Sequence, residues 1–229
     1  MTSIDVATID AKPANKRERQ RLETRARLLD RALQLFAARG FEGTSLRDVA
    51  AEAGVNHGMI KYHFDSKDQL WRAAVTLLFE RMDAELGGHH PEDEGASPLD
   101  QTKNAVRRYV RYCARHPEHA RIMVQESIRD NDRLAWAVDR FIRPQHRAAR
   151  ANRERRGAEG IWPDIPEASL AYMLVASAQM PFVLAPELKH LYGVDMLDDA
   201  HVEAHADALV TLFFAHRAAG NDDIDNPIG

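Results

Sequence analysis

Apolar residues recur at spacings of three and four along most of the chain, which is the period of an amphipathic helix. The first such stripe lies between residues 22 and 36 and consists of Leu22, Ala26, Leu29, Leu33 and Phe36. No segment shows the sustained alternation that a half-buried strand requires. The pattern therefore predicts an all-α fold of about nine helices.

Helix-capping signals between residues 40 and 66 divide this part of the chain into short helices. Gly40 is suited to end the first helix, and Ser45 with Asp48 forms a capping-box pattern at the start of the second. Gly54 ends that helix, and Asn56 caps a third short helix that runs to about residue 64. Two short helices joined by a tight turn match a helix-turn-helix. Ser66 then caps a long fourth helix.

The rest of the chain predicts a second, larger helical domain. Residues 87–98 form a loop, a helix kinked at Pro144 covers about 132–156, and two final helices cover about 167–185 and 198–218. A connecting segment with Pro186 and Gly193 joins that last pair. We expect a disordered tail at 1–15, a helix-turn-helix domain at 16–66, a larger helical domain at 67–220, which the family resemblance described below implies is a ligand-binding and dimerisation domain, and a frayed tail at 221–229.

Charge is distributed unevenly between these two domains. The formal net charge is -4, yet residues 12–68 hold twelve Lys or Arg against eight Asp or Glu. The basic part is suited to phosphate and the acidic remainder is not. Cys113 is the sole cysteine, which favours a buried thiol in a reducing compartment. The longest apolar run, 171–185, is too short to span a bilayer, so we expect a cytoplasmic protein with no membrane partner.

The residues around the two short helices resemble the DNA-binding segment of TetR-family repressors. Three stretches carry the resemblance: Thr44-Ser45-Leu46-Arg47-Asp48-Val49-Ala50, then Ala53-Gly54-Val55-Asn56 with Gly58, then Tyr62-His63-Phe64 with Ser66, Lys67 and Leu70. The resemblance covers about residues 22–70. It implies an N-terminal three-helix helix-turn-helix domain, a larger C-terminal helical domain, and a homodimer that binds palindromic double-stranded DNA.

The same resemblance implies a role for individual residues of the DNA-binding domain, which we call the reading head. Backbone phosphates would be contacted by Thr44, Ser45, His63 and Lys67. Base edges would be met by Arg47, Asn56, His57, Gly58 and Met59, and Gly58 would let the helix lie close to the duplex. Position 61 departs from the family pattern, which favours an aromatic residue, because it holds Lys61. A lysine suits phosphate. The sequence leaves open whether its neighbour Tyr62 points to DNA or to the core.

A small-molecule effector site is expected inside the C-terminal domain. Its wide side chains would be Phe79, Met82, Tyr109, Met123, Trp136, Phe141, Met173 and Met180, and its polar groups would be Tyr112, Glu126 and Gln179. Such a mixture suits an apolar or amphipathic ligand, with Glu126 available for a cationic or hydroxylated group. The family resemblance also implies a dimer through the last two helices, with Leu174, Phe182, Val202, Leu209 and Phe213 at the interface.

Other functions compete with this interpretation. The regulator could answer to a protein partner, or the chain could be a helical enzyme or carrier with Glu126 and the tyrosines as its site. The pairs His201 with His205 and His116 with His119 are more typical of surface histidines than of a metal site. No phosphate-binding loop, nucleophile elbow or HExxH motif occurs, so we expect neither catalysis nor a cofactor.

Overall fold

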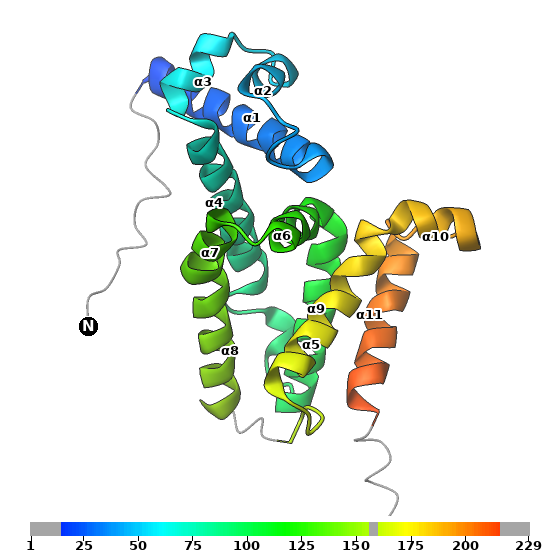
Figure 1. Ribbon diagram of the computed structural model, residues 1–229. Helices are drawn as coiled ribbons and strands as arrows, with labels where there is room; N and C mark the ends of the chain where they lie inside the picture. Colours follow the sequence, from blue (N-terminus) through cyan, green and yellow to red (C-terminus); the bar gives the residue numbers. More distant parts are fainter. Residues whose placement is uncertain (1–14, 156–159, 216–229) are drawn as a thin grey trace, which may run out of the picture. The chain divides into compact units, whose positions relative to one another are not determined.

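The computed structural model describes residues 15–155 and 160–215, and these residues form helices and connecting turns with no strand among them (Figure 1). The chain divides into two compact units, Met1–Leu77 and Leu78–Gly229. The helix α4, Lys67–Leu86, runs through the boundary between them. The expected all-α class is confirmed. The expected tails at 1–15 and 221–229 lie outside the described residues, except for Asn15.

The first unit contains α1 (Lys16–Arg39), α2 (Leu46–Glu52), α3 (His57–His63) and the start of α4. Its helix ends follow the capping signals in the sequence. Ser45 and Asp48 form a reciprocal capping box, Asn56 accepts from the Gly58 N–H at 2.8 Å, and Ser66 accepts from Gln69 N–H at 3.1 Å. The turn between α2 and α3 places Gly54 at a φ of 63°, where a side chain would be strained. These caps satisfy N–H groups that a helix start leaves unpaired.

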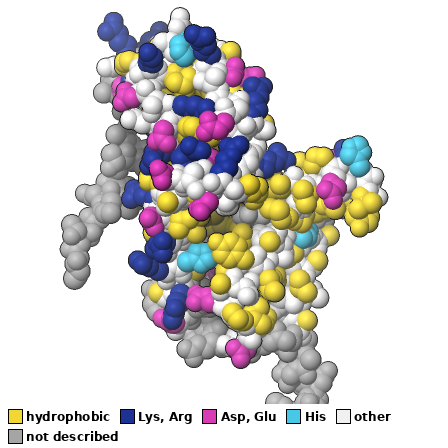
Figure 2. All heavy atoms as spheres, viewed as in Figure 1, with side chains coloured by type: hydrophobic (Ala, Val, Ile, Leu, Met, Phe, Trp, Pro, Cys, Tyr) yellow, Lys and Arg dark blue, Asp and Glu magenta, His cyan; other side chains and the backbone are white. Residues whose placement is uncertain are grey.

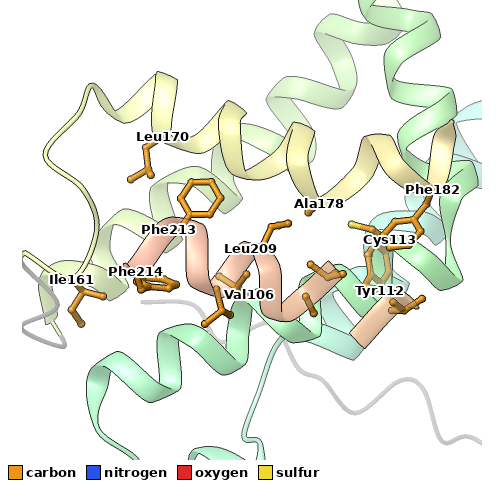
Figure 3. Packing of buried hydrophobic residues seen from close by; sticks show 14 residues of the cluster. Val106, Tyr112, Cys113, Ile161, Leu170, Ala178, Phe182, Leu209, Phe213 and Phe214 are labelled. Atoms are coloured by element: carbon orange, nitrogen blue, oxygen red, sulfur yellow. The ribbon is translucent and has the colours of Figure 1, made fainter. Parts of the chain in front are cut away.

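The second unit is built on α5 (Pro98–Arg115), which packs against α9 (Glu167–Val183) and α11 (Asp199–Phe214). A short 3-10 turn, η1 (Pro91–Asp93), precedes α5, and α6 (Pro117–Arg129) packs on α9. Figure 3 shows side chains of α5, α9 and α11 meeting in one core that includes Val106, Ala178 and Leu209. Two ion pairs, Arg107 with Asp207 and Arg111 with Glu203, join α5 to α11 at the surface beside this core.

The helix expected at 132–156 is interrupted before its proline. It consists of α7 (Asp132–Ala137), a π-helical segment η2 (Val138–Ile142) and α8 (Arg143–Arg155). A proline ring clashes with the carbonyl four residues earlier, which for Pro144 belongs to Arg140 in the π segment. The wider π turn relieves that clash without ending the helix. The predicted irregularity is present, but its form is a π segment.

A second proline lies inside α9, and a histidine compensates for it. Pro181 cannot donate to the carbonyl of Ser177, four residues earlier. That carbonyl instead pairs with Nε2 of His205 on α11 at 2.9 Å. His205 therefore has a structural role in joining α9 to α11. Within the described chain, no group of three or more His, Cys, Asp or Glu gathers that could hold a metal ion.

The segment expected to connect the last two helices is itself a helix, α10 (Ala185–Tyr192), which corrects the sequence-based expectation. Pro186 lies in its first turn, where a missing N–H costs nothing, and Gly193 ends it at a φ of 70°. Because proline and glycine usually interrupt helices, a helix of only two turns between them is not evident from the sequence. Among the described helices, no single one is long and apolar enough to cross a membrane. Taken together, α9 and α10 have the length and composition for it, but they bend by 69° at their junction.

Candidate functional site

One side of the helix α3 packs against the core of the first unit, and its other side is exposed to solvent. Ile60 is fully buried, and the small residues Ala50 and Ala53 on and just after α2 are buried where the two helices meet. Exposed on the opposite side of this motif are Ser45, Arg47, Asn56, His57, Gly58, Lys61 and Tyr62. Met59, His63 and Lys67 are half-buried at its edge. Ten of the eleven predicted DNA contacts are therefore at least partly accessible in the first unit.

Thr44 is the exception. Its side chain is buried, and its hydroxyl lies 2.9 Å from the Gly40 carbonyl and 3.2 Å from that of Leu35. A hydroxyl has a single hydrogen to donate, and here it stabilises the end of α1. The assignment of the Thr44 side chain to a phosphate is therefore corrected to a structural role.

Several other predicted contacts already serve the fold. The Ser45 hydroxyl bonds Asp48 at 2.8 Å, and Oδ1 of Asn56 caps α3. Lys67 places its ammonium 4.4 Å from the centre of the Phe41 ring, a cation–π contact that orients it. Burial, followed by Arg21 and Arg25, lowers the pKa of His63. A neutral His63 is a weaker phosphate ligand than the sequence suggested.

The structure answers the question about Tyr62 and adds two residues to the site. Tyr62 is 68% exposed, so it does not belong to the core. Together with Met59 it lines a hollow of about 380 Å³ whose other wall is the first turns of α1, including Arg17 and Arg21. Glu18 holds the Arg21 guanidinium in place through contacts of 2.6 and 3.0 Å. The signal for this wall was the run of basic residues that opens α1.

In the second unit the predicted effector residues form a line of rings. Phe79 stacks on Phe141, with ring centres 4.5 Å apart, and Trp136 meets Phe141 edge-on at 5.4 Å. At the other end of the line, His119 meets Phe79 edge-on at 4.6 Å and pairs through Nδ1 with the Tyr112 hydroxyl at 2.8 Å. The structure thus brings four of the predicted residues together around a histidine.

The sequence-based prediction that His119 lies on the surface is wrong. The side chain is buried, and burial lowers its pKa to about 4. The missed signal lies in the α6 sequence, where His119, Ile122 and Glu126 share one helix face and all three are buried. His116, at the start of α6, differs: the hydrogen bonds that its ring donates to Glu118 and Glu85 raise its pKa.

This burial predicts a pH dependence of stability. Below about pH 6.5 the unfolded chain protonates its histidines, but the folded chain keeps His119 neutral down to about pH 4. The His119 contribution is therefore fully present above pH 6.5 and is lost as the pH falls towards 4, by roughly 3 kcal/mol. His116 has the opposite sign, since its raised pKa stabilises the fold below pH 6.5.

The measurement is urea unfolding of the wild type and His119→Gln between pH 7.5 and 4.5. We expect the wild type to lose stability more steeply than the variant on acidification. His116 is present in both proteins, so its contribution cancels in the difference. Parallel pH profiles would show that His119 protonates freely in the folded state.

The remaining effector candidates are less uniform. Gln179 donates to the Tyr109 hydroxyl at 2.8 Å, and Glu126 is buried against Asn131 and Arg133. Met82 packs at the edge of the core, and Met123 and Met180 are half-buried. Met173 is 55% exposed, so its assignment to an inward wall is corrected. The expected cavity itself stays a prediction.

The residues predicted at the dimer interface are mostly core residues. Phe182, Val202, Leu209 and Phe213 are buried within one chain, where they pack against α5, and Leu174 is partly buried beside them (Figure 3). A side chain covered by its own chain offers no surface to a second copy, so the assignments of these four buried residues are corrected, whereas that of Leu174 stays a prediction. The outward face of α9 and α11 carries other residues, which are Tyr172, Met173, Ala176, Ala204, Ala208 and Leu212.

Comparisons with known proteins identify similar sequences for the helix-turn-helix segment of the first unit. The family described as "Bacterial regulatory proteins, tetR family" matches residues 28–74, which extend from within α1 into α4. The transcriptional repressor Rv3405c of Mycobacterium tuberculosis is 38% identical over 107 residues, covering 45% of this chain and 53% of that protein. The chain thus spans about half the length of this relative in the match.

Two further proteins are similar over most of the chain. The transcriptional repressor SCO4008 of Streptomyces coelicolor is 29% identical over 185 residues, covering 77% of this chain and 90% of that protein. The crystal structure of AibR with isovaleryl coenzyme A and operator DNA has a TM-score of 0.64 at 16% identity, covering 83% of this chain and 98% of that one. At that identity the likeness shows the fold alone. Taken with the capped α2–turn–α3 motif, these matches show that the chain carries a DNA-binding domain of the TetR family of helix-turn-helix transcriptional regulators.

Proposed function

We propose that this chain is a transcriptional repressor that binds a pseudo-palindromic operator as a homodimer and releases it when a small molecule binds the second unit. The observation that carries the proposal is the outward face of α3. It presents His57, Lys61 and Tyr62 to solvent while Ile60 holds the helix to the core. A helix of this kind fits the major groove, about 12 Å wide, where base edges can be distinguished.

A two-fold dimer determines which DNA it can read. Two copies present their α3 helices at one helical turn of DNA, about 34–36 Å, or a multiple of that distance. The operator should therefore be a pseudo-palindrome whose half-sites are separated accordingly. The basic first turns of α1, with Arg17 and Arg21 beside Tyr62, would add phosphate contacts at each half-site.

The effector would act through the second unit. AibR has been crystallised with both isovaleryl coenzyme A and operator DNA, which supports a small-molecule input for a chain of this fold. An effector releases DNA only if it binds better to a conformation unable to hold the operator. Because α4 carries both Lys67 and Phe79, a shift of the ring cluster at Phe79 has a direct covalent route to the reading head.

Lys61 provides the first test of DNA binding. Selection of bound fragments from genomic DNA identifies the operator, and binding is then measured at several salt concentrations. Lys61→Ala should weaken binding several-fold on operator and random DNA alike and reduce the log–log salt slope by about one. Lys103→Ala, a charge change of the same kind on α5, serves as the matched control and should leave both quantities unchanged.

Two results would contradict the proposal. A wild-type protein with no preference for any selected fragment over random DNA would remove operator binding. A compound library in which nothing shifts both the melting temperature and operator affinity would remove the small-molecule input and favour control by a protein partner.

A further inference from the structure

The helix α10 is the least covered apolar element of the second unit. It leaves α9 at a bend of 69°, and Ala185 is its only buried residue. Figure 1 shows it pointing away from the packed helices α5, α9 and α11. Leu184, Leu188, Leu191 and Tyr192 lie at the spacing of one helix face. Leu191 and Tyr192 are 65% and 68% exposed.

A helix this short does not hold its shape without support. Isolated helices below about 12–15 residues are marginal in water, and most helices are stabilised by burying an apolar face. The support that α10 receives from its own chain is limited to packing near its start against α9, half-burial of Leu188, the Gly193 cap, and an ion pair between Lys189 and Asp195 at 3.1 Å. We therefore expect the apolar face of α10 to be covered by a surface outside the described part of this chain.

The proposed dimer interface is continuous with that face. Figure 2 shows hydrophobic side chains gathered over the second unit and continuing onto the projecting helix. On α9 six residues are exposed and on α11 eight, and many of them are small or charged. Stable interfaces engage roughly 20–30 residues a side. The exposed residues of α9 and α11 fall short of that range, and α10 with Leu197 supplies the large apolar side chains that would extend it.

We propose that α10 is an arm that packs on a second copy of this chain, next to the faces of α9 and α11 that pair with their counterparts. Because a two-fold interface is self-complementary, each copy both extends its arm and receives the other. The inference rests on the homodimer of the proposed function. It adds that Leu184, Leu191 and Tyr192, which are exposed in the monomer beside half-buried Leu188, are covered in the dimer.

Thiol labelling measures this directly. Cys113 is buried and its pKa is raised to about 12, chiefly by that burial, so the natural thiol reacts slowly and gives little background. The probe is Leu191→Cys, and the control is Ile165→Cys, an exposed apolar position before α9. Iodoacetamide labelling is followed across the concentration range in which the full-length chain dimerises.

The expected result is at least a ten-fold slower reaction at position 191 in the dimer, with position 165 unchanged. An equal rate at 191 in monomer and dimer would overturn the inference while leaving the homodimer intact. Protection at 191 by anionic phospholipid vesicles, without protection by dimerisation, would overturn it in favour of a membrane surface. A wild-type chain that stays monomeric throughout would overturn both the arm and the homodimer.

A second variant tests the energetic consequence. Leu191→Ser combined with Tyr192→Ser removes the two most exposed side chains of the face without touching the core. Sedimentation equilibrium should show the dimer dissociation constant raised at least ten-fold, whereas Ile165→Ser should leave it unchanged. Equal dissociation constants for the wild type and the double variant would contradict the proposal.

Discussion

Replacing Gly58 with alanine should weaken operator binding at least ten-fold while leaving the protein as stable as the wild type or more so. Gly58 lies in the first turn of α3 with no positive φ recorded for it, so its backbone suits alanine. A Cβ built there meets nothing closer than Oδ1 of Asn56 at 3.4 Å, an ordinary contact. In a helix, alanine is favoured over glycine by up to about 1 kcal/mol.

The fold therefore gives no reason for a glycine at this exposed position. A close approach of α3 to the DNA duplex would give one, because it leaves no room for a side chain. A methyl group that separates α3 from the bases lengthens every hydrogen bond the helix makes in the groove. Operator affinity and thermal unfolding should be measured on the same preparations. Ala51→Gly is a useful contrast, because it lowers helix stability on α2 without adding bulk to α3. Unchanged operator affinity in Gly58→Ala would show that α3 does not approach the groove at this point.

Gly58→Ala is informative because its expected effects on stability and on operator affinity differ: stability is kept or raised, whereas affinity is lowered. A substitution that lowers both stability and DNA binding can act through unfolding alone. Asn56→Ala has that weakness, because the Asn56 side chain caps α3 and its loss costs about 1 kcal/mol. An effect of Asn56→Ala on sequence preference is therefore interpretable only after its effect on stability has been measured.

The reading head could be predicted from the sequence because its determinants are local. Ser45 with Asp48, Asn56 and Ser66 each form the cap that their spacing predicts, within two or three residues. Gly54 occupies a conformation that glycine favours. Signals of this range do not depend on tertiary packing. The exception within the motif is Thr44, whose partners are the carbonyls of Leu35 on α1 and of Gly40 just after it, and the contact with Leu35 could not be foreseen from the neighbours of Thr44.

The second unit was harder to predict because its last helices are apolar on nearly all sides. A helix without a polar face has no unique inward direction in its sequence. The structure shows that Leu209 and Phe213 of α11 are buried in the core, and that Ala204, Ala208 and Leu212 are exposed. Ion pairs between α5 and α11, such as Arg111 with Glu203, accompany this arrangement, but they join residues far apart in the chain.

Polar residues in the core were misjudged for a related reason. His119 was assigned to the surface by its residue type, although it shares a helix face with Ile122 and Glu126. Its partners, Tyr112 on α5 and Phe79 on α4, become neighbours only in the folded unit. The prediction that the chain is not an enzyme agrees with the match of its DNA-binding domain to a family of transcriptional regulators.

Replacing Arg133 with methionine should be among the most destabilising single changes in the second unit. Glu126 is 1% exposed, and its Oε2 lies 3.1 Å from the Arg133 guanidinium and 2.6 Å from Nδ2 of Asn131. The Arg133 side chain is itself 15% exposed. Removing one partner of a buried ion pair leaves the other charge without compensation and typically costs about 3–5 kcal/mol.

The companion variants separate loss of the charge pair from loss of packing. Glu126→Gln keeps the shape of the side chain and removes its charge, so adding it to Arg133→Met should restore part of the lost stability. Two substitutions that together are milder than one of them alone indicate a buried charge rather than a cavity. Urea unfolding of the four proteins gives the cycle. A cost of under 1 kcal/mol for Arg133→Met would show that water reaches Glu126.

The same cycle tests the role of Glu126 in effector binding. Since Glu126 already has two partners inside the chain, a cationic effector would have to compete with Arg133 for the carboxylate. Glu126→Gln should then leave operator affinity unchanged and abolish the response to cationic compounds, while the response to apolar compounds that contact Phe79 and Phe141 should persist. Equal responses of the wild type and Glu126→Gln to every active compound would confine Glu126 to a structural role.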